Sequence, residues 1–395
     1  MKMKSLAVAV SSALAALVAV PASAQTTISG NVDVGLQGVN HKGNSIPLTA
    51  TSSGSSTSAM QFKGTEEIQK GLNLNWQFEV SLDFANTGGK TAGTSAVGPT
   101  SNVPQSIGNG ASWLEISSAQ LGSLKLGTPN IATLSANGDG NVGFGTGVGA
   151  GYRTVSFDAV RFQNSWRYDT PNLNGFGASL VMVPKNDKQT GATALGNSQN
   201  QVNGRDAVRE LGLSYAQGPL TVRYVDLQTK QFAQTSNGTT ALTLVRGNGE
   251  AFNLRTLSTK YDVNKELTVA YIHQRTGSDI LDKANATSGA TTPSDLKYDR
   301  KSHGFAGSYT MGANKFMLNR VRVSIGDETG TSSTDATKTS LLSLGLDHSL
   351  SKRTTAYIRN ENIKDLAAIK AITGYTAVGG STTYKQFAVG VRHTF

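Results

Sequence analysis

The charged residues of this chain that could act on small ions share one sequence setting: they alternate with apolar residues at a spacing of two. Glu79 and Asp83 follow this pattern between Trp76 and Phe84. An alternating segment forms an extended strand with two faces, so its charged side chains lie opposite the apolar ones. Charges held on a wet face attract, repel or orient ions and polar solutes. The same reasoning selects four basic residues, Lys125, Arg161, Arg167 and Arg359.

Catalysis is a second kind of chemistry to consider, and the sequence argues against it. No G-x-S-x-G, H-E-x-x-H or P-loop spacing occurs, and there is no cysteine. By alternation, four of the five histidines fall on apolar faces, while His41 lies in a polar loop. A nucleophile, a base and an orienting group in register are therefore missing. We expect no enzyme activity, no cofactor and no metal site.

The elements that would position these charges are long strands. Residues 72–84 alternate without a break over thirteen positions, whereas strands of soluble sheets usually have about 5–6 residues. A long strand that is apolar on one face and polar on the other suits a barrel wall with lipid outside and water inside. A long half-buried strand of a soluble sheet is the alternative for this segment alone.

The connections between strands favour the barrel. Short turns alternate with long polar loops along the whole chain, giving seven turns, eight loops and sixteen strands between Thr27 and Phe395. Even strand numbers, short periplasmic turns and long outer loops are typical of bacterial outer-membrane barrels. We therefore predict an all-β fold, a 16-stranded antiparallel transmembrane β-barrel. Barrels of about 16–18 strands leave an aqueous channel.

The first residues are predicted to direct export. Lys2 and Lys4 precede an apolar run from Leu6 to Val20, and small residues follow up to Ala24. This pattern predicts a signal peptide over residues 1–24 and a barrel domain over residues 25–395. Removing the leader leaves 34 basic against 26 acidic residues, a net charge of about +8. The basic residues form no run or nucleic-acid motif, so we expect outer-membrane lipid as the surroundings and no nucleic acid as a partner.

Several segments resemble a known family. Residues 58–67, residues 167–172 and residues 389–395, which end on Phe395, are similar to strands and turns of the Gram-negative general-diffusion porins of the β-proteobacterial and neisserial type. The resemblance implies a homotrimer that passes small hydrophilic solutes and inorganic ions by passive diffusion. It also implies that Phe395 is an assembly signal read by the barrel-assembly machinery.

The resemblance further implies that the third long loop, residues 129–160, folds into the lumen and narrows it. Seven glycines between residues 138 and 151 lead us to expect irregular backbone there rather than a helix. We expect the loop, which contains Asp139, to face Arg161 across the narrowest point. Ala59 and Thr128 stand where many family members have arginine, so the expected anion preference is weak.

An adhesin that displays its long polar loops is the alternative to a channel, and ion conductance distinguishes the two.

The alternation of apolar and polar residues also predicts which side chains of the last strand face lipid. Val389 should face lipid and Ala388 should face water, so Val389→Arg should impair assembly far more than Ala388→Arg.

Overall fold

The computed structural model describes residues 25–41, 45–85, 110–150, 160–184, 207–229, 244–246, 252–278, 280–282, 298–327, 337–364 and 383–395. The expected signal peptide, residues 1–24, lies outside these residues. Among the described residues, no helix is long and apolar enough to cross a membrane.

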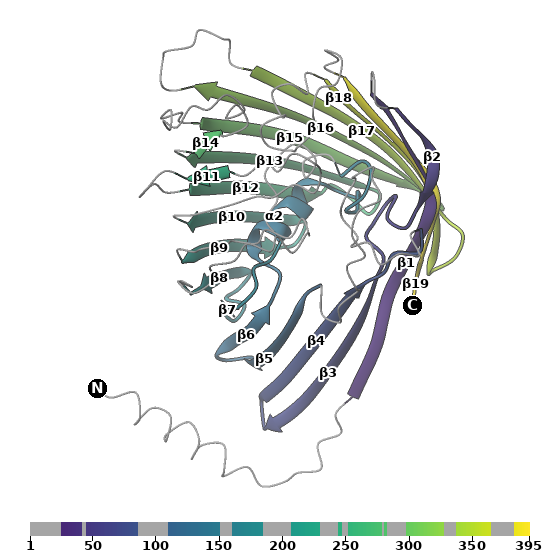
Figure 1. The fold of residues 1–395 in the computed structure, drawn as a ribbon. Helices are drawn as coiled ribbons and strands as arrows, with labels where there is room; N and C mark the ends of the chain where they lie inside the picture. Colours follow the sequence, from purple (N-terminus) through teal and green to yellow (C-terminus); the bar gives the residue numbers. More distant parts are fainter. Residues whose placement is uncertain are drawn as a thin grey trace.

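The chain forms a closed antiparallel barrel (Figure 1). The first strand, β1 (Gln25–His41), pairs with the last, β19 (Tyr384–Thr394), in a continuous register from Asn31↔Thr394 to His41↔Tyr384. Because the first and last strands pair, the wall has no free sheet edge. Seventeen strands share this sheet, and sixteen of them form the wall, since β2 (Ile46–Thr51) is an added strand of the first long loop beside β1. The predicted 16-stranded fold is confirmed.

The other wall strands follow one another around the barrel in sequence order. They are β3 (Ala59–Gln69), β4 (Leu72–Ser81), β5 (Ser112–Ser118), β6 (Gly122–Thr128), β7 (Ser165–Asp169), β8 (Phe176–Val183), β9 (Val208–Gln217), β10 (Leu220–Thr229), β12 (Phe252–Asp262), β13 (Leu267–Ser278), β15 (Tyr298–Met311), β16 (Asn314–Asp327), β17 (Thr337–Ser349) and β18 (Thr354–Lys364). A separate ribbon pairs β11 (Leu244–Arg246) with β14 (Ile280–Asp282).

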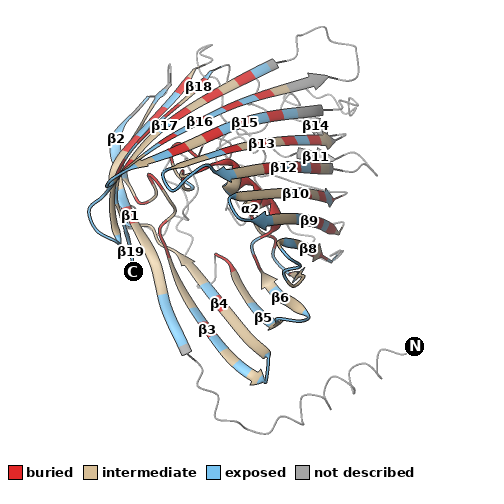
Figure 2. Ribbon diagram, turned by 180° about the vertical axis from the view of Figure 1, so that it is seen from behind, coloured by how far each residue is buried: buried red, intermediate tan, exposed pale blue. Residues whose placement is uncertain are grey.

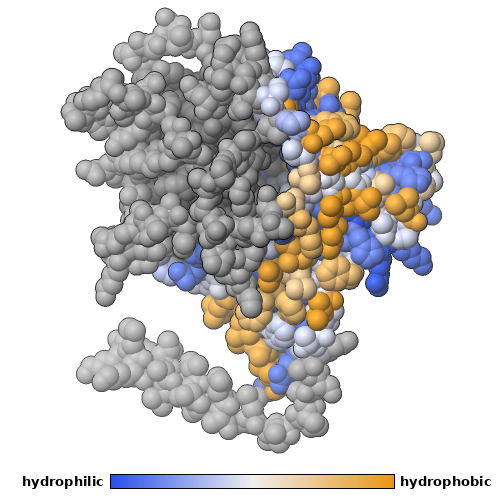
Figure 3. All heavy atoms as spheres, turned by 45° about the vertical axis from the view of Figure 1, so that its right-hand side comes forward, coloured by the Kyte–Doolittle hydropathy of each residue, from blue (hydrophilic) through white to orange (hydrophobic). Residues whose placement is uncertain are grey.

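The two faces of the wall differ as a membrane barrel requires. Buried and exposed residues alternate along β15, β16 and β17 (Figure 2). The exposed set is apolar over much of the wall; Val391, for example, is 43% exposed, whereas Ala388 of the same strand is fully buried on the inner side. Figure 3 shows hydrophobic residues gathered on one outer face, with hydrophilic residues at its edges. This is the surface expected against lipid.

A hydrophobic core lies inside the barrel, against β8, β9, β10 and β12. Val181, Val208 and Leu227 point inward and pack with Ile131 and Phe162, which belong to the base of the third loop. Alternation continued back from Trp166 and Tyr168 would place Phe162 on the apolar outer face of a strand beginning at residue 161, but Phe162 is buried inside the barrel. The reason is local: Asn164 has a φ of 54°, which breaks the extended conformation, and β7 begins only at Ser165.

Candidate functional site: the lumen and its inserted loop

The third loop enters the lumen as predicted, but it does so as a helix. The helix α2 (Ala132–Gly140) lies against the inner face of β9, β10, β12 and β13 (Figure 1). The expectation of irregular backbone is therefore wrong for this part. Residues 132–137 contain no glycine, and the glycines that motivated the expectation begin only in the last turn of the helix, where they terminate it.

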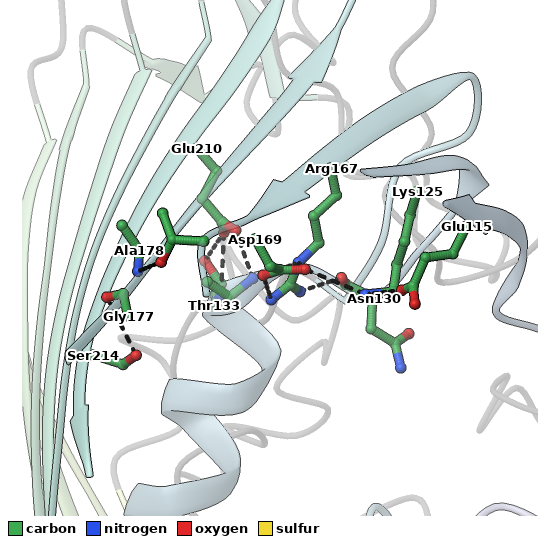
Figure 4. A network of polar contacts seen from close by, with 12 residues as sticks. Glu115, Lys125, Asn130, Thr133, Arg167, Asp169, Gly177, Ala178, Glu210 and Ser214 are labelled. Atoms are coloured by element: carbon green, nitrogen blue, oxygen red, sulfur yellow. Dashed lines mark hydrogen bonds and ion pairs between the residues drawn. The ribbon is translucent and has the colours of Figure 1, made fainter. Parts of the chain in front are cut away.

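A carboxylate from the wall caps this helix. Glu210 of β9 accepts hydrogen bonds from the backbone N–H groups of Ala132 (2.6 Å) and Thr133 (3.1 Å), and from the Thr133 hydroxyl (2.6 Å) (Figure 4). The residue before the helix, Ile131, provides no side-chain cap. The first N–H groups of a helix lack partners within it and carry partial positive charge. The fully buried Glu210 therefore satisfies and neutralises the helix start.

Beyond α2, the loop crosses to the opposite wall. Asn141 accepts a hydrogen bond from Asn319 of β16, and the Phe144 ring lies 5.7 Å from the Arg359 guanidinium of β18. Gly147 donates a backbone hydrogen bond to Ser55 (3.0 Å). A Cβ at Gly147 would collide with the backbone at Ser53 and Gly54, so the close approach requires glycine at this position.

Ser55 belongs to a second inserted segment, residues 52–58 of the first loop. Asp33 on the inner face of β1 holds this segment, accepting backbone N–H groups of Ser55 (3.0 Å) and Ser56 (2.7 Å). The hydroxyl of Tyr357 on β18 donates to the other oxygen of the same carboxylate (2.6 Å). The first and third loops therefore meet inside the barrel and brace each other.

Arg161 lies at the base of the third loop rather than across from it. It forms an isolated bridge with Asn130, and Ile131 donates a hydrogen bond to the carbonyl of Val160 (3.0 Å), so the two ends of the loop run side by side. The Arg161 guanidinium lies 3.4 Å from a carboxylate oxygen of Glu79 on β4. The expectation that Arg161 faces the loop across the lumen is wrong, because the turn at Asn164 shifts it out of β7 and into the base of the loop.

Arg167 and Lys125 form a second group on the same side of the lumen (Figure 4). The Arg167 guanidinium binds Asp169 with Nε and Nη2 at 2.7–2.9 Å and donates through Nη1 to the carbonyl of Asn130 (2.6 Å). Lys125 lies 2.6 Å from a Glu115 oxygen and 3.2 Å from an Asp169 oxygen. These residues come from neighbouring strands β5, β6 and β7, which bring them together.

The remaining predicted residues are separate from this group. Asp139 of α2 contacts Arg223 (2.5 Å) and Lys260 (3.9 Å) on the wall behind the helix. Arg359 is fully buried and pairs with Asp347 (2.7 Å), so it anchors Phe144 and does not line the open lumen. Asp83 accepts a hydrogen bond from the Ser52 hydroxyl (2.7 Å).

Phe395 follows the last strand, β19, and lies beside β1, where the barrel closes. Its backbone N–H and carbonyl exchange hydrogen bonds with Gly30 of β1, both at 3.1 Å.

The charges are arranged differently from the expected placement of Asp139 and Arg161 across the narrowest point. Glu79 lies beside Arg161, and Asp139 lies beside Arg223 and Lys260, so the negative charge of these two residues is compensated locally. Sequence reasoning missed Asp33, Glu210 and Arg223. Asp33 and Glu210 had a signal, since each is an acidic residue at an inward position of an alternating strand, but their partners lie far away in the sequence.

Comparisons with known proteins agree with this architecture. The comparison with curated proteins found no match. Among solved structures, the chain is similar to an anion-selective porin from Comamonas acidovorans, with 19% identity, a TM-score of 0.68 and coverage of 94% of this chain and 100% of that one. It is also similar to OmpT of Vibrio cholerae in its trimer form, with 14% identity, a TM-score of 0.62 and coverage of 94% and 99%. A third is OmpF of Salmonella typhi in complex with daunomycin, with 13% identity, a TM-score of 0.61 and coverage of 94% and 97%.

At these identities the solved structures show a shared fold, and the family follows from the sequence. A family profile described as Gram-negative porin matches residues 9–365, which is most of the chain. Together with the closed 16-stranded wall and the loop inside it, this match makes the protein a non-enzymatic diffusion channel of the outer membrane. The chain belongs to the Gram-negative porin family.

Proposed function

We propose that this channel passes small hydrophilic solutes and inorganic ions by passive diffusion, with a weak preference for anions. The observation that carries the proposal is the charge of the inserted loop. Its described part, residues 129–150, contains a single acidic residue, Asp139, which two basic side chains of the wall neutralise. Because the described part of the loop leaves no uncompensated acidic side chain, the basic side chains at the base of the loop determine the field in the opening.

The proposed selectivity residues are those basic side chains and their acidic partners. Arg161, Arg167 and Lys125 would attract anions, while Glu79 reduces the charge of Arg161, with which it pairs at 3.4 Å. Because most of these charges have an acidic neighbour, the preference should be weak. The Comamonas porin, to which this chain is similar, is anion-selective.

Reversal potentials in a salt gradient test the proposal. Wild-type protein in planar bilayers should show a small anion preference, and Arg161→Glu should shift it toward cations because the reversed charge lies beside Glu79. Lys265→Glu, in an exposed turn, makes the same change in net charge and should have little effect. Equal shifts in both variants would mean that Arg161 is not in the ion path. A folded, inserted protein without conductance would overturn the channel proposal itself and favour the adhesin alternative.

We also propose a cleaved leader and a homotrimer. The V. cholerae OmpT structure is a trimer form, and apolar outer side chains of β1, β4 and β5, such as Ile28, Phe78 and Leu114, are about half exposed in a single chain. Sedimentation in detergent should give the mass of three copies of the chain, whereas the mass of a monomer would contradict the homotrimer.

Amino-terminal sequencing of the exported protein tests the cleaved leader. The sequence should begin at Gln25, and an intact start at Met1 would contradict cleavage.

A further inference from the structure

The far part of the third loop, residues 144–148, is hydrogen-bonded to the first loop and not to the wall. Gly147 and Val148 donate backbone hydrogen bonds to the carbonyls of Ser55 (3.0 Å) and Gly54 (2.9 Å). Within the described residues, every hydrogen bond that residues 144–148 make outside their own loop goes to the first loop. The first loop is therefore the polar support of this part of the third loop.

Two threonine side chains extend the contact between the loops. The Thr146 hydroxyl accepts a hydrogen bond from the backbone N–H of Thr57 and also lies beside the Thr57 hydroxyl, both at 2.8 Å. Thr146 is exposed, so this edge of the contact is open to water.

The wall meets the same part of the third loop only through side-chain packing. Val148 packs against Tyr357 and Ala388, and the Phe144 ring lies against the Arg359 guanidinium. Apolar packing is non-directional, whereas hydrogen bonds constrain both the distance and the direction between two backbone segments. The first loop therefore does more than the wall to fix the position of residues 144–148.

One buried carboxylate holds the first loop in turn. Asp33 of β1, which is fully buried, accepts the backbone N–H groups of Ser55 and Ser56. Its own backbone N–H donates to the Ser58 hydroxyl (2.8 Å), which donates to the Ser52 carbonyl (2.6 Å). Among the described residues, the Asp33 carboxylate bonds no residue of the third loop, so it reaches that loop through the first.

We propose that Asp33 is a positioning residue that sets, through the first loop, the place of the third loop and the width of the opening. Glu210 fixes the start of the third loop, and the contact with the first loop fixes its far part. Without the Asp33 carboxylate, segment 52–58 loses two backbone hydrogen bonds and can leave the lumen, and residues 144–148 lose their support. The opening then widens. This inference rests on the passage of small solutes proposed above and concerns its size limit.

The size limit of the channel tests the role of Asp33. Single-channel conductance in planar bilayers is measured with polyethylene glycols of increasing mass, because a polymer that enters the channel lowers the conductance and an excluded one does not. In about 1 M KCl, charge is screened beyond about 3 Å, so the limit reports size and not charge. Asp33→Ala should admit larger polymers than wild type. Asp262→Ala removes the same charge at the end of β12, where the carboxylate bonds Thr268 of the neighbouring strand, and should leave the limit unchanged.

A reversible cross-link then shows whether Asp33 acts through the first loop. The chain contains no cysteine, and the contact between the Thr57 and Thr146 hydroxyls brings the two side chains close enough for an engineered disulfide. Segment 52–58 is tied at its two ends to β2 and β3, so a covalent bond to it gives the third loop a fixed support. Oxidised D33A/T57C/T146C should return to the wild-type limit, and a reducing agent should restore the larger one.

Four results would overturn the proposal: an unchanged or smaller limit in Asp33→Ala, an equal shift in Asp262→Ala, a disulfide that does not form in T57C/T146C, or a larger limit that the disulfide does not reverse. Absence of conductance in the wild type would contradict the channel itself. If circular dichroism shows that Asp33→Ala does not fold, Asp33→Asn replaces it. This variant keeps one acceptor oxygen, so its limit should shift less, and the disulfide should again reverse the shift.

Discussion

Replacing Glu210 by alanine should release the inserted helix from the wall. The wild-type carboxylate accepts three hydrogen bonds from the start of α2, and it is fully buried. Glu210→Ala leaves the backbone N–H groups of Ala132 and Thr133 without their acceptor and removes the negative charge that faces the positive end of the helix. Both groups can regain partners only if water enters or the helix moves away from β9.

The size of this effect follows from the hydrogen bonds that the substitution removes. Losing a helix cap costs about 0.5–2 kcal/mol, and a hydrogen bond to a charged group contributes about 1.5–3 kcal/mol. Because these contributions overlap, we expect docking of the helix to weaken by about 2–4 kcal/mol. At 1.4 kcal/mol per factor of ten, the undocked population rises on the order of 30- to 1,000-fold. The barrel wall itself should persist, since its strand pairing does not depend on α2.

Single-channel recording in planar bilayers measures this change directly. Glu210→Ala should give a noisier open current and a larger mean conductance than wild type, with unchanged β-structure by circular dichroism. Glu210→Gln keeps one acceptor oxygen and should lie between the two. Glu266→Ala, in an exposed turn, is the control and should behave as wild type. If Glu210→Ala matched wild type in both conductance and noise, the reasoning that this carboxylate holds the loop would be refuted.

Two further predictions concern β18 and β19, on the wall across the lumen from Glu210. Tyr357→Phe removes the hydroxyl that donates to Asp33, so the inserted segment 52–58 should loosen. The barrel should lose about 1–3 kcal/mol of stability, measured as a lower thermal unfolding midpoint. An unchanged midpoint and unchanged conductance would show that this hydrogen bond is dispensable. Val389→Arg places a charge toward lipid and should reduce membrane insertion, at a cost of about 2–4 kcal/mol near the midplane. The sequence suggested that Ala388→Arg would be mild, but Ala388 is fully buried against Val148 and Tyr357, so it should insert normally while displacing the third loop and altering conductance. Equal insertion defects in both variants, measured by heat-modified gel mobility of membrane fractions, would mean that the inner and outer faces are assigned wrongly.

The wall could be predicted because its signals are local. The alternation along residues 72–84 depends only on which side chains face lipid and which face water, and every strand repeats the same choice. The short and long connections are equally visible in the sequence, so strand number and direction followed without any long-range information. Alternation misplaces Phe162 because one residue, Asn164, adopts a left-handed conformation that alternation alone does not reveal.

The content of the lumen depended on contacts between distant residues. Glu210 and Thr133 are 77 positions apart, and Asp33 and Tyr357 are 324 positions apart; they meet only because the barrel closes. The sequence by itself determined a closed wall around water and indicated that residues 129–160 enter it. Only the tertiary structure decided that the loop begins as a helix, that Arg359 anchors it, and that Arg161 lies at its base, because inward side chains find their partners across the lumen and not along the chain.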